Sequence, residues 1–203
     1  MIIEELYCFD DRYRTDYGDY ICGIDEAGRG LLAGPVCCAA VILKRNSRFS
    51  WLNDSKKITE KRREVLFEQI TSEAVTYSIV FVDNKKIDKM NILAATMSGM
   101  KEAAEGIEID VPCFLVDGNK VPDGMKNAYP IIKGDAKSAS IAAASVLAKV
   151  SRDRFMTELD FKYPEYGFAK HKGYATKLHY ERIERFGSSE YHRMTFLGKL
   201  NND

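Results

Sequence analysis

The five cysteines of this 203-residue chain show no C-x-x-C spacing and are odd in number. Most of them lie inside apolar runs, where cysteine behaves as a small hydrophobic residue. This usage indicates a reducing compartment. No His and Cys cluster with zinc spacing is present either, because the histidines are confined to the last part of the chain: His171, His179 and His192.

Long hydrophobic segments are also missing. No stretch approaches the ~20 apolar residues that cross a bilayer, and the first ten residues, MIIEELYCFD, are acidic and therefore unlike a signal peptide. We expect a cytoplasmic protein without membrane contact. The sequence has no internal repeat, low-complexity tract or obvious linker, and its length suits one domain.

Net charge is absent as well, since 30 Lys and Arg balance 30 Asp and Glu. The distribution is nevertheless uneven, and local fields matter more to a polyanion than the total does. Residues 44–63 carry eight basic against two acidic side chains, whereas residues 1–20 carry two against six. The basic segment fits either a solvated helix face or a surface that binds a polyanion.

Strand patterns alternate with helical patterns along most of the chain. Short apolar runs predict strands over 20–25, 34–43, 75–82, 112–118 and 129–135, the first two as an antiparallel hairpin. Apolar spacing predicts helices over 59–73 and over 91–107, with Asn91 as N-cap. The alanine- and serine-rich stretch 134–155 predicts a slender helix that can lie very close to a sheet. An α/β fold with a mixed sheet follows.

The stretch GIDEAGRG, Gly23–Gly30, has two glycines framing four residues, as in a phosphate-binding loop. A phosphate-binding loop uses backbone amides and a lysine around an anion. Here Asp25 and Glu26 would repel a phosphate, so that interpretation is excluded. The adjacent acids need another explanation.

Three acids, Asp25, Asp117 and Asp135, each end an apolar run. Singly, each has a structural explanation: a loop start at Asp25, a turn at Asp117-Gly118, and an N-cap at Asp135. Together they would meet at one edge of a mixed sheet, where neighbouring strands lie ~5 Å apart. Carboxylates so close repel each other unless divalent ions lie between them, and Mg²⁺ prefers such oxygen ligands. Two such ions could activate a water molecule and stabilise the leaving oxygen in the hydrolysis of a phosphodiester.

Several longer motifs occur in a consistent order from about residue 20 to about residue 197. They are GIDEAGRG followed by AGPV, DSKKITEKRRE, VDGN, KGDAKSASIAAASVLAKVSRD and HKGYAT…H…FG…HR…F. Together they resemble the ribonuclease HII family, the type 2 ribonucleases H.

The resemblance implies a ribonuclease H-like fold, in which a five-stranded mixed sheet carries helices on both faces. It implies a single domain over residues 1–203, with a catalytic core at about 19–155 and a C-terminal helical substrate-binding region at about 156–203. The implied activity is endonucleolytic hydrolysis of RNA in RNA–DNA hybrids and incision beside single ribonucleotides in duplex DNA. This is the chemistry of ribonucleotide excision repair, and its products carry 3′-hydroxyl and 5′-phosphate ends.

By the same resemblance, the metal and catalytic site consists of Asp25, Glu26, Asp117 and Asp135, with Mg²⁺ or Mn²⁺ as cofactor. The loop Gly28-Arg29-Gly30 would read the 2′-hydroxyl through its main chain, since glycine allows close backbone approach and that hydroxyl distinguishes RNA from DNA. Tyr174 would pack on the sugar of the following deoxynucleotide. Phosphate contacts are expected from Lys56, Lys57 and Ser138.

Departures from the family pattern are few: Leu31 stands where proline is common, and Ser151 where threonine is frequent. The tail MTFLGKL either packs onto the core or binds a sliding clamp, and packing is favoured. We expect a monomer. A type 3 ribonuclease H is the nearer alternative, disfavoured by Arg29 and Asp135. The second alternative is a non-catalytic module that binds nucleic acid in a metal-dependent way.

Overall fold

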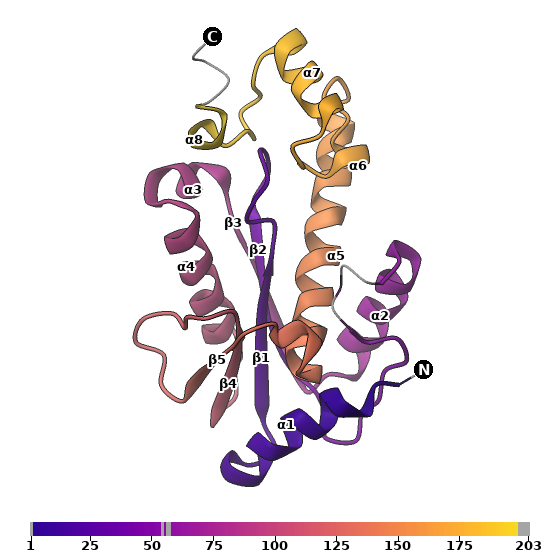
Figure 1. The fold of residues 1–203 in the computed structure, drawn as a ribbon, viewed down its shortest axis with the longest axis vertical. Helices are drawn as coiled ribbons and strands as arrows, with labels where there is room; N and C mark the ends of the chain where they lie inside the picture. The colour runs from indigo at the N-terminus through magenta and orange to yellow at the C-terminus, as the bar shows by residue number, and fades with distance from the viewer. Residues whose placement is uncertain (1, 54, 56–57, 199–203) are drawn as a thin grey trace.

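The computed structural model describes residues 2–53, 55 and 58–198 (Figure 1). Its strands are β1 Ile21–Ala27, β2 Val36–Ile42, β3 Thr76–Val82, β4 Cys113–Asp117 and β5 Ala128–Ile131. Its helices are α1 Glu4–Tyr17, α2 Glu60–Glu73, α3 Asn84–Met90, α4 Ile92–Glu105, α5 Ala139–Lys162, α6 Phe168–His171, α7 Lys177–Phe186 and α8 Met194–Leu197, with a 3₁₀ turn η2 at Gly134–Ala136.

The five strands form one mixed sheet in the order β3-β2-β1-β4-β5. β1 pairs antiparallel with β2, which pairs antiparallel with β3. β1 pairs in parallel with β4, and β4 with β5. The predicted hairpin and mixed sheet are confirmed. In the β1–β4 register Ile24 lies opposite Val116, so the next residues lie side by side, with Asp25 two residues before the end of β1 and Asp117 at the end of β4.

Helix α5 lies unusually close to β1, as its small side chains predict. A Cβ atom at Gly23 would lie 2.1 Å from the main-chain carbon of Ser140, so only glycine fits there. Buried alanines of α5 then pack on the β2 side chains that point to this face, together with Leu66 and Ile70 of α2. The close contact fixes the height of α5 above the acidic end of β1.

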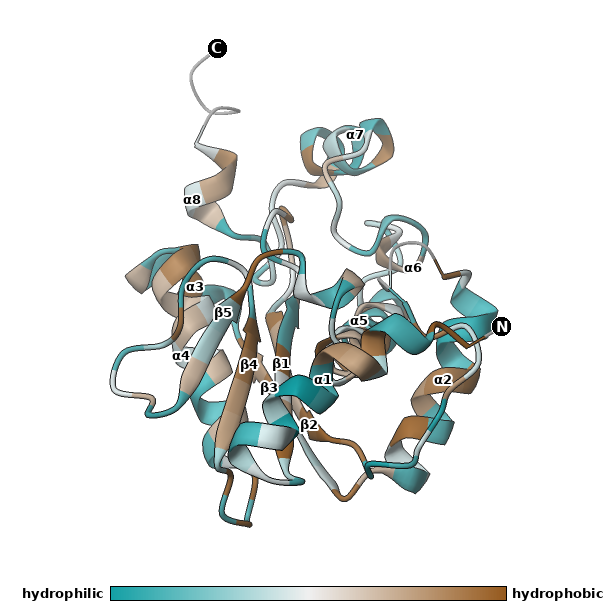
Figure 2. Cartoon of the chain, turned by 60° about the horizontal axis from the view of Figure 1, so that its bottom comes forward, coloured by the Kyte–Doolittle hydropathy of each residue, from teal (hydrophilic) through white to brown (hydrophobic). Residues whose placement is uncertain are grey.

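The opposite face of the sheet is covered by α4. Ile24, Cys38 and Ala40 point to this side and pack against Met100 and Ala103. The alternation of β2 side chains between the two faces is the period-2 pattern of a strand buried on both sides. Figure 2 shows β1 and β4 in brown between α4 on one side and α1 and α5 on the other.

The predicted helix starts agree with the structure at two caps. Asn91 caps α4 by accepting a hydrogen bond from the amide of Ala94 at 3.0 Å, and Thr59 occupies the N-cap position of α2. The cap of α5 is Ser138. The suggestion that Asp135 caps this helix is therefore wrong, because Asp135 lies one turn earlier, in η2.

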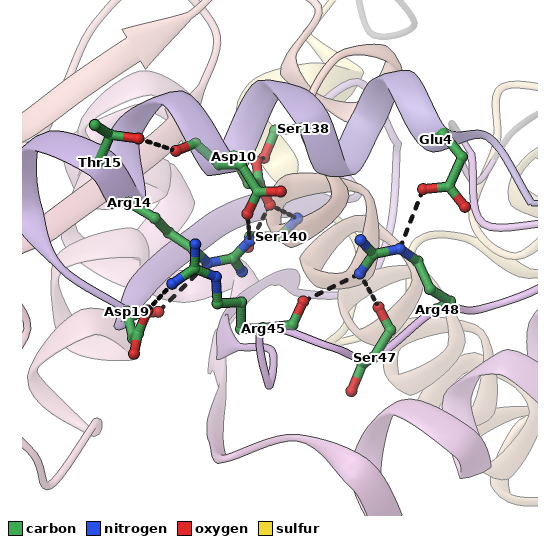
Figure 3. Close-up of polar contacts among 11 residues, drawn as sticks. Glu4, Asp10, Arg14, Thr15, Asp19, Arg45, Ser47, Arg48, Ser138 and Ser140 are labelled. Carbon is green, nitrogen blue, oxygen red and sulfur yellow. Dashed lines mark hydrogen bonds and ion pairs between the residues drawn. The ribbon is translucent and has the colours of Figure 1, made fainter.

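The N-terminal helix α1 was not expected from the sequence. Its buried Asp10 accepts hydrogen bonds from the hydroxyls of Ser138 and Ser140 and from the amide of Ser140, at 2.5, 2.7 and 2.8 Å (Figure 3). Helix α1 is thus attached to the first turn of α5. That turn follows directly after the segment that carries Asp135.

The chain after α5 forms small helices beyond the end of the sheet at which β1 finishes (Figure 1). Ala33, Met156, Tyr166 and Phe168 form a separate apolar cluster there. Leu197 in α8 is buried, so packing of the tail is confirmed for this residue. None of the described helices combines the length and apolar character that a bilayer crossing requires.

Candidate metal centre

Three carboxylates meet at the end of β1. One oxygen each from Asp25, Glu26 and Asp117 lies within 4.8 Å of the others. Asp25 and Glu26 are consecutive on β1, and Asp117 ends the neighbouring parallel strand β4. The convergence expected from strand ends is therefore confirmed for Asp25 and Asp117, and Glu26 joins them.

Hydrogen bonds fix the orientation of the cluster. Asp25 Oδ1 accepts from the amide of Glu26 at 2.7 Å, and Asp117 Oδ1 accepts from the amide of Gly134 at 2.6 Å. The second bond connects β4 to η2, the turn that carries Asp135. Asp135 is half-buried and lines the same cavity, although it is not one of the three acids whose oxygens lie within 4.8 Å.

The electrostatics of the cluster favour a bound cation. Burial raises the pKa of Asp25 well above its ordinary value, and the nearby charges of Glu26 and Asp117 raise this pKa further. Burial also raises the pKa of Glu26, although Arg29 opposes the shift through an ion pair of 3.2 Å. Buried carboxyl groups this close together must either take up protons or bind a metal ion. An all-carboxylate donor set suits hard ions such as Mg²⁺ or Mn²⁺.

A cavity of about 280 Å³ surrounds these acids. The predicted residues that line it include Gly28, Arg29, Gly30 and Tyr174. Gly28 has φ +103°, and a Cβ there would lie 2.2 Å from Nε of Arg152. A Cβ on Gly30 would meet nothing within 4 Å. Glycine is therefore required by the chain's own packing at position 28 but not at position 30.

Tyr174 lies on the other wall and is 45% exposed. The Nζ atom of Lys149 lies 5.5 Å from its ring centroid, and it also forms an ion pair of 2.7 Å with Asp153. The main-chain carbonyl of Tyr174 is 2.9 Å from Nδ1 of His179. An exposed aromatic face is thus held at the rim of the acidic cavity.

The expectation for Ser138 is corrected by the structure. Its side chain is fully buried, its hydroxyl donates to Asp10, and it accepts from the amide of Ile141 at 3.2 Å. As the helix cap it is not accessible to a phosphate. The expected phosphate contacts Lys56 and Lys57 lie outside the described residues.

Four further polar residues line the cavity and were not selected from the sequence: Ser55, Ser145, Lys149 and Arg152. Ser145 bonds to Ser55 through hydroxyl oxygens 2.8 Å apart, and its hydrogen bond to Asp25 lowers the pKa of that acid. Ser145, Lys149 and Arg152 follow one another at spacings of four and three along α5. Residues at this spacing lie on one face of a helix. The sequence alone does not show that this face points to the acids, because that depends on how α5 packs on β1.

A five-stranded mixed sheet with clustered carboxylates at the end of its central strand is characteristic of a metal-dependent nuclease with a ribonuclease H-like fold. The sequence model for ribonuclease HII matches residues 22–199. This chain belongs to the ribonuclease HII family and is a ribonuclease H, an endoribonuclease that acts on RNA–DNA substrates. The family depends on metal ions.

Relatives support this assignment over nearly the whole chain. A ribonuclease HII of Caldicellulosiruptor bescii is 53% identical over 97% of this chain and 96% of that protein. One of Clostridioides difficile is 51% identical over 89% of this chain and 71% of its own length.

Solved structures agree. Ribonuclease H2 from Pyrococcus horikoshii OT3 has a TM-score of 0.72 at 25% identity, covering 91% of this chain and all of that one. The PCNA:RNase HII complex from Archaeoglobus fulgidus gives 0.71 at 25% identity, over 86% of this chain and 94% of that one. Bst-RNase HIII in complex with Mn²⁺ shares the fold, with a TM-score of 0.67 at 16% identity over 91% of this chain and 71% of that one.

Proposed function

We propose that the protein hydrolyses RNA in RNA–DNA hybrids and incises duplex DNA on the 5′ side of single embedded ribonucleotides. The products would carry 3′-hydroxyl and 5′-phosphate ends. The observation that carries the proposal is the single cavity that contains both the carboxylate cluster and the loop Gly28-Arg29-Gly30. Catalysis and recognition of the ribonucleotide would therefore occur side by side.

The acids would hold two Mg²⁺ or Mn²⁺ ions, one mainly on Asp25 and Asp135, and the other near Asp25, Glu26 and Asp117. Such ions, when bound, supply an activated water and stabilise charge on the leaving 3′-oxygen. The chain's own contribution is orientation. The Glu26 and Gly134 amides hold Asp25 and Asp117 in place, and Ser145 supports Asp25 from α5.

Recognition of the substrate would come from both walls of the cavity. Main-chain groups at residues 28–30 would contact the 2′-hydroxyl, which is both donor and acceptor. Tyr174 would offer its exposed face to the sugar of the next deoxynucleotide. Residues of about 156–203 would thus form a substrate-binding part attached to a catalytic part of about 19–155.

The test is an incision assay on duplex DNA with one ribonucleotide, with and without Mg²⁺, mapped to the nucleotide. We expect one cut at the 5′ side of the ribonucleotide, which disappears when EDTA removes the metal. Mn²⁺ should restore cleavage.

A parallel substrate with four ribonucleotides separates the proposal from a type 3 activity. Efficient cleavage of the four-ribonucleotide duplex combined with little cleavage of the single-ribonucleotide duplex would contradict it. Complete inactivity on both substrates with Mn²⁺ would instead favour a binding module.

A further inference from the structure

Two arginines beside the cavity are buried without an acidic partner. Arg152 is 1% exposed and Arg193 is 0% exposed, and within the part of the chain that the structure describes neither has a carboxylate oxygen within 4.0 Å of its guanidinium nitrogens. Burial lowers the pKa of Arg152 to about 10 and that of Arg193 to about 9. Both therefore remain charged at neutral pH.

Each guanidinium instead donates to three main-chain carbonyls. Arg193 donates from Nε to Gly34, from Nη1 to Arg29 and from Nη2 to Gly28, at 2.9, 2.8 and 2.7 Å. Arg152 donates to Pro35, Lys172 and Ala33, at 3.0, 2.8 and 3.0 Å. Five of the six carbonyls belong to the segment 28–35, which includes the loop in the cavity.

The contacts of Arg193 determine where the loop amides point. In a trans peptide the C=O and N–H groups lie in one plane and point in opposite directions. Because the carbonyls of Gly28 and Arg29 point at Arg193, the amides of Arg29 and Gly30 point away from it. Among the described residues neither amide has a hydrogen-bond partner, and both residues line the cavity.

Arg193 is itself held firmly in this position. Its amide donates to the carbonyl of Leu32 at 2.8 Å, and Ala33 and His192 form a β-bridge. The side chain and main chain of residue 193 therefore both contact the segment that they orient.

We propose that Arg193 is a positioning residue for ribonucleotide recognition, holding the carbonyls of Gly28 and Arg29 so that the amides of Arg29 and Gly30 face the 2′-hydroxyl. The inference rests on the proposed function, in which this loop reads that hydroxyl. Arg152 supports the same loop from α5. Its Nε lies 2.2 Å from the position that a Cβ of residue 28 would take, and its hydrogen bond to the Lys172 carbonyl connects the loop to the Tyr174 wall.

The residue type matters because the planar guanidinium has five donors in a fixed fork. A lysine ammonium keeps the charge but cannot hold three carbonyls in the same geometry. Arg193→Lys should therefore preserve electrostatics while loosening the loop. This variant therefore distinguishes an effect of loop geometry from an effect of charge.

The experiment measures binding of two duplexes of one sequence, one all-DNA and one with a single ribonucleotide. Ca²⁺ replaces Mg²⁺, because it binds oxygen ligands without demanding octahedral geometry, and gels confirm that the duplex stays intact. Wild type should prefer the ribonucleotide duplex. In Arg193→Lys we expect this preference to fall ~10-fold, the equivalent of one net hydrogen bond, while affinity for all-DNA stays unchanged.

Arg12→Lys is the matched control, since Arg12 is exposed on α1 and its change should leave both affinities as in wild type. If wild type shows no preference, the proposed recognition itself fails. If wild type shows a preference and Arg193→Lys keeps it, or loses affinity equally for both duplexes, the positioning role is overturned. Should Arg193→Lys not fold, as followed by thermal unfolding, Arg152→Lys is compared in the same way, and a retained preference there also overturns it.

Discussion

Asp25 is the buried member of the carboxylate cluster. It is only 4% exposed, which is an unfavourable position for a carboxylate that would carry its charge alone. The hydrogen bond from the Glu26 amide orients its carboxylate, and the neighbouring Asp117 adds negative charge instead of compensating it. Asp25 must therefore either take up a proton or bind a cation. In the proposed function it binds a cation, and removing its charge should affect catalysis more than substrate binding.

Asp25→Asn should lower the cleavage rate by orders of magnitude, because the amide weakens metal binding and adds no charge. Binding of the hybrid should remain measurable, since phosphate and shape contacts persist. Single-turnover cleavage and a binding titration on the same preparation separate the two effects. Turnover like that of wild type would refute the role of Asp25.

The two loop glycines provide a matched pair of variants. Gly28→Ala should destabilise the protein by roughly 1–3 kcal/mol, because its backbone is left-handed and the new methyl would collide with Arg152. Gly30→Ala should unfold at the wild-type temperature, because open space surrounds the added Cβ. It should still slow cleavage by crowding the cavity. Thermal unfolding and incision rates check both, and an equal loss of stability in the two variants would contradict this interpretation.

At the scale of elements, the sequence predicted the parts whose signal is local. Strands β1 to β5 and helices α2, α4 and α5 follow from apolar periodicity and from caps such as Asn91, although β5 ends at Ile131 and not at the predicted residue 135. Helix α1 was missed because its acidic, tyrosine-rich sequence has no strong periodic pattern. It is held by distant contacts, which are the hydrogen bonds of Asp10 to the start of α5 and the burial of Leu6 and Tyr7 in the core.

The site was predictable to a similar extent. Asp25 and Asp117 follow from strand ends, and Glu26 follows from the family resemblance. Ser138 was misassigned and Arg193 was not selected, because each depends on a partner more than a hundred residues away. The spacing of residues along the chain does not reveal contacts between such distant segments.

Asp10→Ala should test the attachment of α1. The change removes the acceptor from the Ser138 and Ser140 hydroxyls and the Ser140 amide, all of which are buried. Leaving buried donors unpartnered costs about 1–3 kcal/mol, so we expect the free energy of unfolding to fall by that order in a denaturant titration. Asp16→Ala, on the same helix but exposed, is the control and should change stability little. Equal stability of the two variants would show that the contact between α1 and α5 contributes nothing.

At the scale of the whole molecule, three buried histidines join the segments after α5. His192 Nδ1 accepts from the amide of Ser189 at 2.8 Å, so its Nε2 carries the proton that is donated to Nε2 of His179 at 3.0 Å. His179 then donates from Nδ1 to the Tyr174 carbonyl. His171 stacks on His179 with ring centroids 4.0 Å apart. This arrangement requires every ring to be neutral.

Stability should therefore fall in mild acid. Burial lowers the pKa of His179 and of His192 to about 4, below the ordinary value of about 6.5. Between these pH values the unfolded chain binds protons that the native protein excludes, so the free energy of unfolding decreases as pH falls from 7 towards 4. Between pH 7 and 5 we expect the two histidines together to contribute a loss of about 3–4 kcal/mol.

His179→Gln removes one of the titrating rings and provides the comparison. Denaturant titrations at several pH values between 7 and 5 should show a smaller decrease in stability for the variant than for wild type. Buried carboxyls such as Asp10, whose pKa is raised by burial, contribute the opposite slope in both proteins and cancel in the difference. Parallel stability curves would mean that His179 is protonated as easily in the native protein as in the unfolded chain, and the neutral network would then be wrong.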